Sequence, residues 1–161
     1  MFYIANISDD SRSKELLKNL EDFAQNLNHD VVPTFIKIEQ EIALLEDEEK
    51  NEYLELMEMD EPVLSKVIFK GYEILGLQTY FTAGPQEIRA WTIPLNASAP
   101  NAAGVIHTDF ERGFIKAEVI AFDDYIANKG EAGAKENGKW RLEGKEYIVK
   151  DGDVIHFKFN V

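Results

Sequence analysis

The chain has 161 residues, of which 45% are apolar and 29% charged, and its formal net charge at pH 7 is −13. It contains no cysteine, which excludes disulfide bonds and thiolate metal sites. No apolar run reaches the roughly 18 residues that a membrane span needs, and the first residues lack the basic start and apolar core of a signal peptide. We therefore expect a soluble, cytoplasmic protein of one domain or two small ones, neither secreted nor membrane-spanning.

The negative charge is concentrated in one segment. Residues 39–61 carry eleven carboxylates against the single cation Lys50. An acidic chain repels the phosphates of nucleic acids at long range, so nucleic-acid binding needs a local basic face. From Gln86 to the end, ten basic residues stand against twelve acidic ones, which leaves room for such a face there.

The first elements form a strand–helix–strand pattern. Residues 2–5 predict a short strand, apolar residues from Leu16 to Leu27 share one helical face, and residues 31–36 predict a second strand. This connection usually makes a right-handed parallel crossover. Because two strands do not form a stable sheet alone, we expect the unit to be the edge of something larger, with Met1 at a truncation.

Two helical stretches follow. Apolar residues continue at helical spacing from Ile38 to Leu45 into the acidic segment, whose carboxylates we interpret as a solvated face rather than a cation site. Pro62 opens a further helix with an apolar stripe from Leu64 to Leu75, and Gly76 is a natural cap at its end.

The pattern after Gly76 changes to the period of β-strands. The expected elements are strands at 77–83 and 87–93 around Gly84-Pro85, a helix at 102–106, a strand at 115–120, a helix-like stretch at 123–137, and short strands at 140–142, 147–149 and 154–159. The strand at 115–120 places Ile115, Ala117 and Val119 on one face, and the last strand does the same with Ile155, Phe157 and Phe159. Mixed strands crossed by one or two helices predict a small α+β domain of the β-grasp kind.

Two features of the sequence give little support for a phosphate-binding or metal-binding site. Residues 133–139 match part of a phosphate-binding loop, but Trp140 stands where the magnesium-binding Ser or Thr belongs, and the segment precedes a strand instead of opening a helix. We interpret its glycines as a helix end and a turn. The three histidines, His29, His107 and His156, lack the spacing of zinc ligands, so no metal site is expected.

The segment His107-Thr108-Asp109-Phe110 is the most distinctive cluster. An imidazole, a hydroxyl and a carboxylate follow a helix end, and Arg112 and Lys116 come close behind. One interpretation is structural: Thr108 or Asp109 caps the turn while Phe110 packs. The other is a loop that contacts RNA or a partner, in which the two cations meet phosphates.

Three stretches between Gly71 and Val161 carry a family resemblance: GYEILGLQTYFTAGPQEIRAWTI, AAGVIHTDFERGFIKAEVI and GKWRLEGKEYIVKDGDVIHFKFNV. They closely resemble the C-terminal part of the YchF/Obg-like ATPase family, including its TGS domain, and the resemblance extends at lower density to residue 1. It implies that residues 1–45 are the end of a P-loop NTPase domain, residues 46–83 a helical connector, and residues 84–161 a TGS domain with a β-grasp, ubiquitin-like fold.

The resemblance also implies functional residues. Family members hydrolyse ATP, often in preference to GTP, and read the base through an N-x-x-E motif; the matching residues here are Asn6-Ile7-Ser8-Asp9. Asp9 in place of Glu shortens the carboxylate, and Phe35-Ile36-Lys37 stand where the family has small residues beside the base, which leaves the choice between ATP and GTP open. For the loop, the resemblance implies contacts to RNA or the ribosome through His107, Thr108, Asp109, Arg112 and Lys116, with Arg89 nearby.

Two functional hypotheses follow from this resemblance. The family's phosphate-binding loop, switch segments and magnesium ligands lie upstream of anything in this sequence, so the chain as given should not hydrolyse nucleotide or hold ATP or GTP with Mg²⁺. The leading hypothesis is a binding module whose partners are RNA or the ribosome and the missing NTPase domain of its own chain, with no DNA and no membrane. The alternative is part of an active nucleotide hydrolase in which the TGS domain only packs on the NTPase domain and regulates it.

Overall fold

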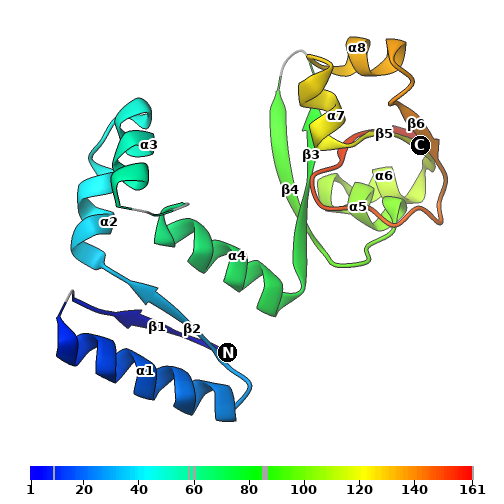
Figure 1. The fold of residues 1–161 in the computed structure, drawn as a ribbon. Coiled ribbons are helices and arrows are strands. Elements are labelled where there is room, and N and C mark those ends of the chain that lie inside the picture. The colour runs from blue at the N-terminus through cyan, green and yellow to red at the C-terminus, as the bar shows by residue number, and fades with distance from the viewer. Residues whose placement is uncertain (9, 58, 60, 85–86, 161) are drawn as a thin grey trace. The chain divides into compact units, whose positions relative to one another are not determined.

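The structure is a computed structural model that describes residues 1–8, 10–57, 59, 61–84 and 87–160 (Figure 1). The chain divides into two compact units, Met1–Leu75 and Gly76–Val161. The predicted boundaries at 45/46 and 83/84 differ from this division. The strand at 77–83 belongs to the sheet of the second unit, and the helices after residue 45 belong to the first.

The described residues of the first unit form two strands and four helices. They are β1 (Phe2–Asn6), α1 (Ser11–Asn26), β2 (Asp30–Thr34), α2 (Ile36–Ala43), α3 (Asp47–Leu56) and α4 (Val63–Leu75). The strands are parallel, with Phe2 opposite Asp30 and Asn6 opposite Thr34, which confirms the predicted crossover connection. Lys70 of α4 forms an ion pair of 2.8 Å with Asp30 and joins this helix to β2.

Much of the apolar surface of the first unit is exposed. Ala24 of α1 is buried, but Leu16 and Phe23 on the predicted apolar face are 58% and 54% exposed. Leu75 at the end of α4 is 70% exposed. A two-stranded sheet offers too little area to cover these side chains, as its size predicts.

The second unit is a five-stranded mixed sheet with four short helices. Its elements are β3 (Leu77–Ala83), β4 (Ile88–Pro94), α5 (Ala99–Ile106), α6 (Thr108–Arg112), β5 (Phe114–Ile120), α7 (Phe122–Ala127), α8 (Glu131–Glu136), β6 (Arg141–Glu143) and β7 (Val154–Phe159). The strand order is β4-β3-β7-β5-β6, in which β3 and β7 are parallel and the other pairs antiparallel. The sequence predicted this α+β composition.

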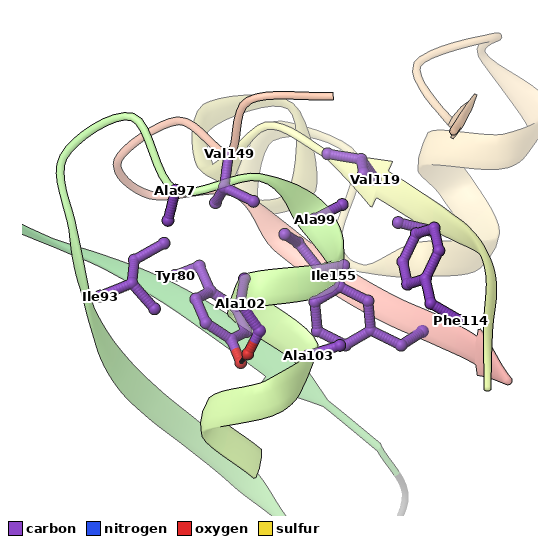
Figure 2. Close-up of a cluster of buried hydrophobic side chains, with 12 residues drawn as sticks. Tyr80, Ile93, Ala97, Ala99, Ala102, Ala103, Phe114, Val119, Val149 and Ile155 are labelled. Atoms are coloured by element: carbon purple, nitrogen blue, oxygen red, sulfur yellow. Dashed lines mark hydrogen bonds between the residues drawn. The ribbon is translucent and has the colours of Figure 1, made fainter. Parts of the chain in front are cut away.

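Helix α5 covers one face of the sheet (Figure 2). Its Ala99, Ala102 and Ala103 are fully buried, and small side chains let the helix approach the strands closely. Tyr80 of β3 is also fully buried, and its hydroxyl donates a hydrogen bond of 2.9 Å to the carbonyl oxygen of Ala102. This pairing satisfies the polar end of a large core residue and fixes α5 on the sheet.

A β-bulge in β5 changes the predicted face of one residue. Phe114 pairs with Phe159 and Lys116 with Lys158, so Ile115 is an extra residue in this strand. Phe114 takes the buried position at 4% exposure, whereas Ile115 is 55% exposed. The prediction that Ile115 shares the inner face with Ala117 is therefore wrong, because strict alternation assumes an unbroken ladder.

Two other predicted elements differ from the structure. The helical stretch at 123–137 is two helices, α7 and α8, because the chain turns at Gly130, whose φ of 110° suits only glycine well. The predicted strand at 147–149 forms only a single bridge, between Ile148 and Ser98.

Side-chain hydrogen bonds hold the segment between β6 and β7 in place. Asp153, which is 2% exposed, accepts hydrogen bonds from the Tyr147 hydroxyl at 2.7 Å and the Lys150 backbone N–H at 2.9 Å. Arg141 lies 3.5 Å from the same carboxylate. The Gln78 side chain donates to the Val149 carbonyl oxygen at 2.8 Å, which ties the segment to β3.

Candidate functional site

His107 joins the two helices of the distinctive cluster. Its extended backbone ends α5 and begins α6, and its Nδ1 accepts a hydrogen bond of 3.2 Å from the backbone N–H of Asp109. The capping residue is thus the histidine itself, not Thr108 or Asp109. Because Nδ1 is the acceptor, a neutral ring carries its proton on Nε2, and the side chain is 60% exposed. The imidazole edge is therefore available to a partner while the ring is held in place.

The other residues of the cluster follow this cap along α6. Thr108 and Arg112 are exposed, and Asp109 lies with one carboxylate oxygen 3.5 Å from the imidazole Nδ1. Within the described part of the chain Arg112 forms no ion pair, so its charge is free to meet an anion. Phe110 points to the sheet and stacks on Phe159 at 3.7 Å between ring centres.

Lys116 and Arg89 lie apart from this cluster. Lys116 pairs directly with Lys158, next to the pair of Glu118 and His156, on the sheet face opposite Ala117 and Phe157. The structure therefore does not bring Lys116 to the His107 loop. Arg89 lies on β4, with its guanidinium 4.2 Å from the centre of the Trp91 ring.

A pocket of about 530 Å³ adjoins the loop on the α5 side of the sheet. Its apolar walls come from β4, the end of α5, α6 and β7, and include Trp91, Ile106, Phe110, Phe157 and Phe159. Sequence reasoning assigned Phe110 to packing and missed this pocket. The only signal was the number of aromatic residues on the inner face, because their convergence depends on the fold.

The residues that the resemblance assigned to base recognition lie in the first unit. Asn6 ends β1, and its Oδ1 is 3.5 Å from the backbone nitrogen of Ile36 at the start of α2. The carboxyl ends of β1 and β2 thus meet at Asn6, whose side chain is exposed. Asp9 lies outside the described residues.

Asp10 caps the helix that follows. Its carboxylate accepts hydrogen bonds from the Ser8 hydroxyl at 2.5 Å and the Ser13 backbone N–H at 2.8 Å. These hydrogen bonds, that from Ser8 first, lower the pKa of Asp10 to about 2. Asp10 therefore carries a negative charge at the N-terminus of α1 at neutral pH.

The remaining predicted features have local roles. Gly133 lies inside α8, where a Cβ would meet the backbone of Asn128, and Gly138 follows the helix with a φ of 67°. Gly138 thus forms the predicted turn, whereas Gly133 serves a close approach inside α8 instead of the predicted helix end. No group of three metal-binding side chains occurs among the residues described, and no helix there is long and apolar enough to cross a membrane.

Comparison with known proteins places the chain in a family. The family model YchF-GTPase_C, described as a protein of unknown function (DUF933), matches residues 77–160, more than half of the chain. The chain belongs to the YchF-GTPase_C family. The match covers the whole described second unit except Gly76, so the His107 cluster and the aromatic pocket both lie within the family's domain.

Relatives of this YchF-GTPase_C chain are similar beyond that domain. It is 59% identical over 160 residues to a protein of Pasteurella multocida and 52% identical over 165 residues to one of Bacillus subtilis, both named "Ribosome-binding ATPase YchF". These matches cover 99% and 100% of the chain but 44% and 45% of the relatives, so the chain spans less than half of their length.

A solved structure shows the same arrangement of elements. The YchF GTPase of Schizosaccharomyces pombe matches with a TM-score of 0.81 and 32% sequence identity, over 98% of this chain and 43% of that one. The mixed α/β architecture of the chain is therefore that of part of a YchF protein. The family resemblance expected from the sequence is confirmed at this level.

Proposed function

We propose that this chain is the distal part of a ribosome-associated, YchF-type NTPase and that its second unit is a TGS-type β-grasp module that contacts RNA. The observation that carries the proposal is the His107 cap. It holds an exposed imidazole at the start of a short helix that Phe110 fixes to the sheet, and Arg112, which forms no ion pair among the described residues, lies at the end of that helix. Both relatives are named as ribosome-binding ATPases, and these names support RNA as the partner.

Charge supports the second unit as the contacting part. The acidic segment at 39–61 belongs to the first unit, whereas basic and acidic residues nearly balance in the second. Arg112 can meet a phosphate, and the Nε2 of His107 can donate a hydrogen bond to a phosphate or a base. Thr108 and Asp109 offer a hydroxyl and a carboxylate on the same turn.

We further propose that the first unit is the edge of the nucleotide-binding domain. The parallel strands, the exposed apolar side chains of α1 and the place of Asn6 at the strand ends fit that role. Asn6 alone cannot repay the translational and rotational freedom that a nucleotide loses on binding. The chain by itself should neither bind ATP below millimolar concentration nor hydrolyse it.

Co-sedimentation with ribosomes tests the RNA contact. The variants are Arg112→Ala and His107→Asn, because asparagine keeps an acceptor for the cap while the imidazole is lost. Lys116→Ala is the matched control: it removes an equal charge four residues away on the other sheet face. We expect Arg112→Ala to weaken binding and to lower the salt dependence by about one phosphate contact, and Lys116→Ala to bind as the wild type does.

Equal binding by all four chains at 50 and 150 mM salt would contradict the proposal. The second unit would then be left with the alternative role, packing on the NTPase domain and regulating it. Melting temperatures are compared first, since a surface charge change seldom costs more than about 0.5 kcal/mol.

A further inference from the structure

The aromatic pocket beside the His107 loop has the size and lining of a binding site. Its volume of about 530 Å³ falls in the range of small-ligand sites, about 300–1,000 Å³. It lies between Trp91 of β4, Phe110 of α6 and Phe159 of β7, three aromatic rings from separate elements. Phe159 is 37% exposed although the pattern of its strand assigns it to the inner face, so part of this aromatic surface is open.

Few of the residues that line the pocket carry polar side chains. Trp91 donates its indole N–H to the Thr82 hydroxyl oxygen at 2.9 Å, which leaves the Thr82 hydroxyl hydrogen free to donate elsewhere. Glu87 also lines the pocket, and its carboxylate lies 4.0 Å from the Arg89 guanidinium. Acceptors and donors beside aromatic faces suit a flat ring with polar edges better than an aliphatic side chain.

Positive charge lies at the pocket's border. The Arg89 guanidinium is stacked over Trp91, and its contact with Glu87, at 4.0 Å, is long. A ligand that places a planar ring in the pocket and an anionic group outside it would meet the Arg89 guanidinium.

We propose that this pocket receives one unpaired nucleobase of single-stranded RNA, stacked against Phe110 and Phe159, with a flanking phosphate at Arg89. The inference rests on the proposed function and names what the surface recognises: an unstacked base rather than a duplex. Stacking on aromatic side chains is how proteins bind single strands with little dependence on sequence.

The test uses the full chain with Trp140→Phe, which leaves Trp91 as the single tryptophan. Trp140 lies outside the pocket, and its buried Nε1 has no hydrogen-bond partner, so phenylalanine removes no bond there. An adenosine RNA hexamer is titrated while Trp91 emission is recorded. Three other ligands are titrated in the same way for comparison: the same hexamer without bases, free AMP, and an acetylated hexapeptide of alternating leucine and serine.

Phe110→Leu is the decisive variant, because leucine keeps an apolar side chain but removes the aromatic face. Its matched control is Phe122→Leu on α7, a 45% exposed ring that contacts Phe81 on the other face of the sheet. We expect the hexamer to quench Trp91, the abasic hexamer to bind at least about tenfold more weakly, and Phe110→Leu to weaken hexamer binding about fivefold or more. Phe122→Leu should leave it unchanged.

The outcomes separate this inference from the proposed function. Hexamer binding that depends on Arg112 but neither quenches Trp91 nor responds to Phe110→Leu would overturn the base pocket and leave the RNA contact standing. Quenching that responds to Phe110→Leu, together with ribosome binding that is unchanged in His107→Asn and Arg112→Ala, would overturn the proposed contact at the His107 loop and leave the base pocket standing. Quenching by AMP at the affinity of the hexamer would assign the pocket to free nucleotides, and quenching by the peptide alone to proteins; either result overturns an RNA pocket.

Discussion

Replacing Gly113 by alanine should destabilise the second unit strongly. Gly113 ends α6 and precedes β5, and a Cβ there would overlap the carbonyl oxygen of Asn160 and lie 2.8 Å from its carbonyl carbon. The atoms in the way are backbone, so a side-chain rotation cannot relieve the contact. The hydrogen bond of 2.9 Å from the Asn160 N–H to the Gly113 carbonyl oxygen would be stretched or lost as the chains separate.

The size of the effect follows from two terms. Overpacking of a tight contact costs about 1–3 kcal/mol, and a lost backbone hydrogen bond about 0.5–1.5 kcal/mol. We expect Gly113→Ala to lower the free energy of unfolding by about 2–4 kcal/mol. Moving residue 160 would also shift Phe159 away from Phe110, so the variant should lose the aromatic pocket as well.

Urea unfolding followed by tryptophan fluorescence measures this loss, because both tryptophans, Trp91 and Trp140, lie in the second unit. The control is Gly104→Ala in α5, where a Cβ meets only the Glu111 side chain, whose nearest atom at 2.7 Å is the flexible carboxylate end. This control should stay within about 1 kcal/mol of the wild type, since alanine also favours the helix. A Gly113→Ala chain as stable as Gly104→Ala would refute the close approach of the two backbones.

Two further predictions concern buried polar groups of the second unit. Asp153→Ala should cost about 2–5 kcal/mol in the same urea assay, because it leaves the Tyr147 hydroxyl and the Lys150 N–H without their acceptor; a loss below about 1 kcal/mol would contradict the network. Burial raises the pKa of Tyr80, and burial with the Asp153 hydrogen bond raises that of Tyr147, so the folded chain holds these protons more tightly than the unfolded chain does. Their stabilisation is therefore complete below the ordinary tyrosine pKa of 10.0 and falls as the pH rises above it, by about 1.4 kcal/mol per pH unit for Tyr80, and Tyr80→Phe should remove that loss in alkaline unfolding curves.

The order of elements could be predicted from the sequence because each depends on local patterns. Alternation of apolar residues located β3, β4 and β7, and the helical stripe before Gly76 located α4. The prediction of which face a residue occupies failed where contacts with residues distant in sequence determine it. Ile115 has the pattern of an inner-face residue, but the bulge that turns it outward depends on the register against Phe159, about forty residues away.

The site was predictable in the same measure. A polar cluster after a helix end indicated either a helix cap or a contact loop. In the structure His107 fits both roles, because its Nδ1 forms the cap while its side chain stays exposed. The pocket could not be predicted, because Trp91, Phe110 and Phe159 are far apart in sequence and each has an ordinary packing role in its own element.

The bulge also explains why sequence distance misleads about the charged residues. Arg112 and Lys116 are four residues apart and would form one basic patch on a continuous helix. Here α6 ends at Arg112, and the bulge at Ile115 then sets the alternation of β5, so that Ala117 faces the core and Lys116 points to the opposite face. Arg112 is thus left at the end of the helix that His107 caps, while Lys116 joins the row of Lys158, His156 and Glu118. A single phosphate, rather than a duplex backbone, is the RNA feature that one such cation can match.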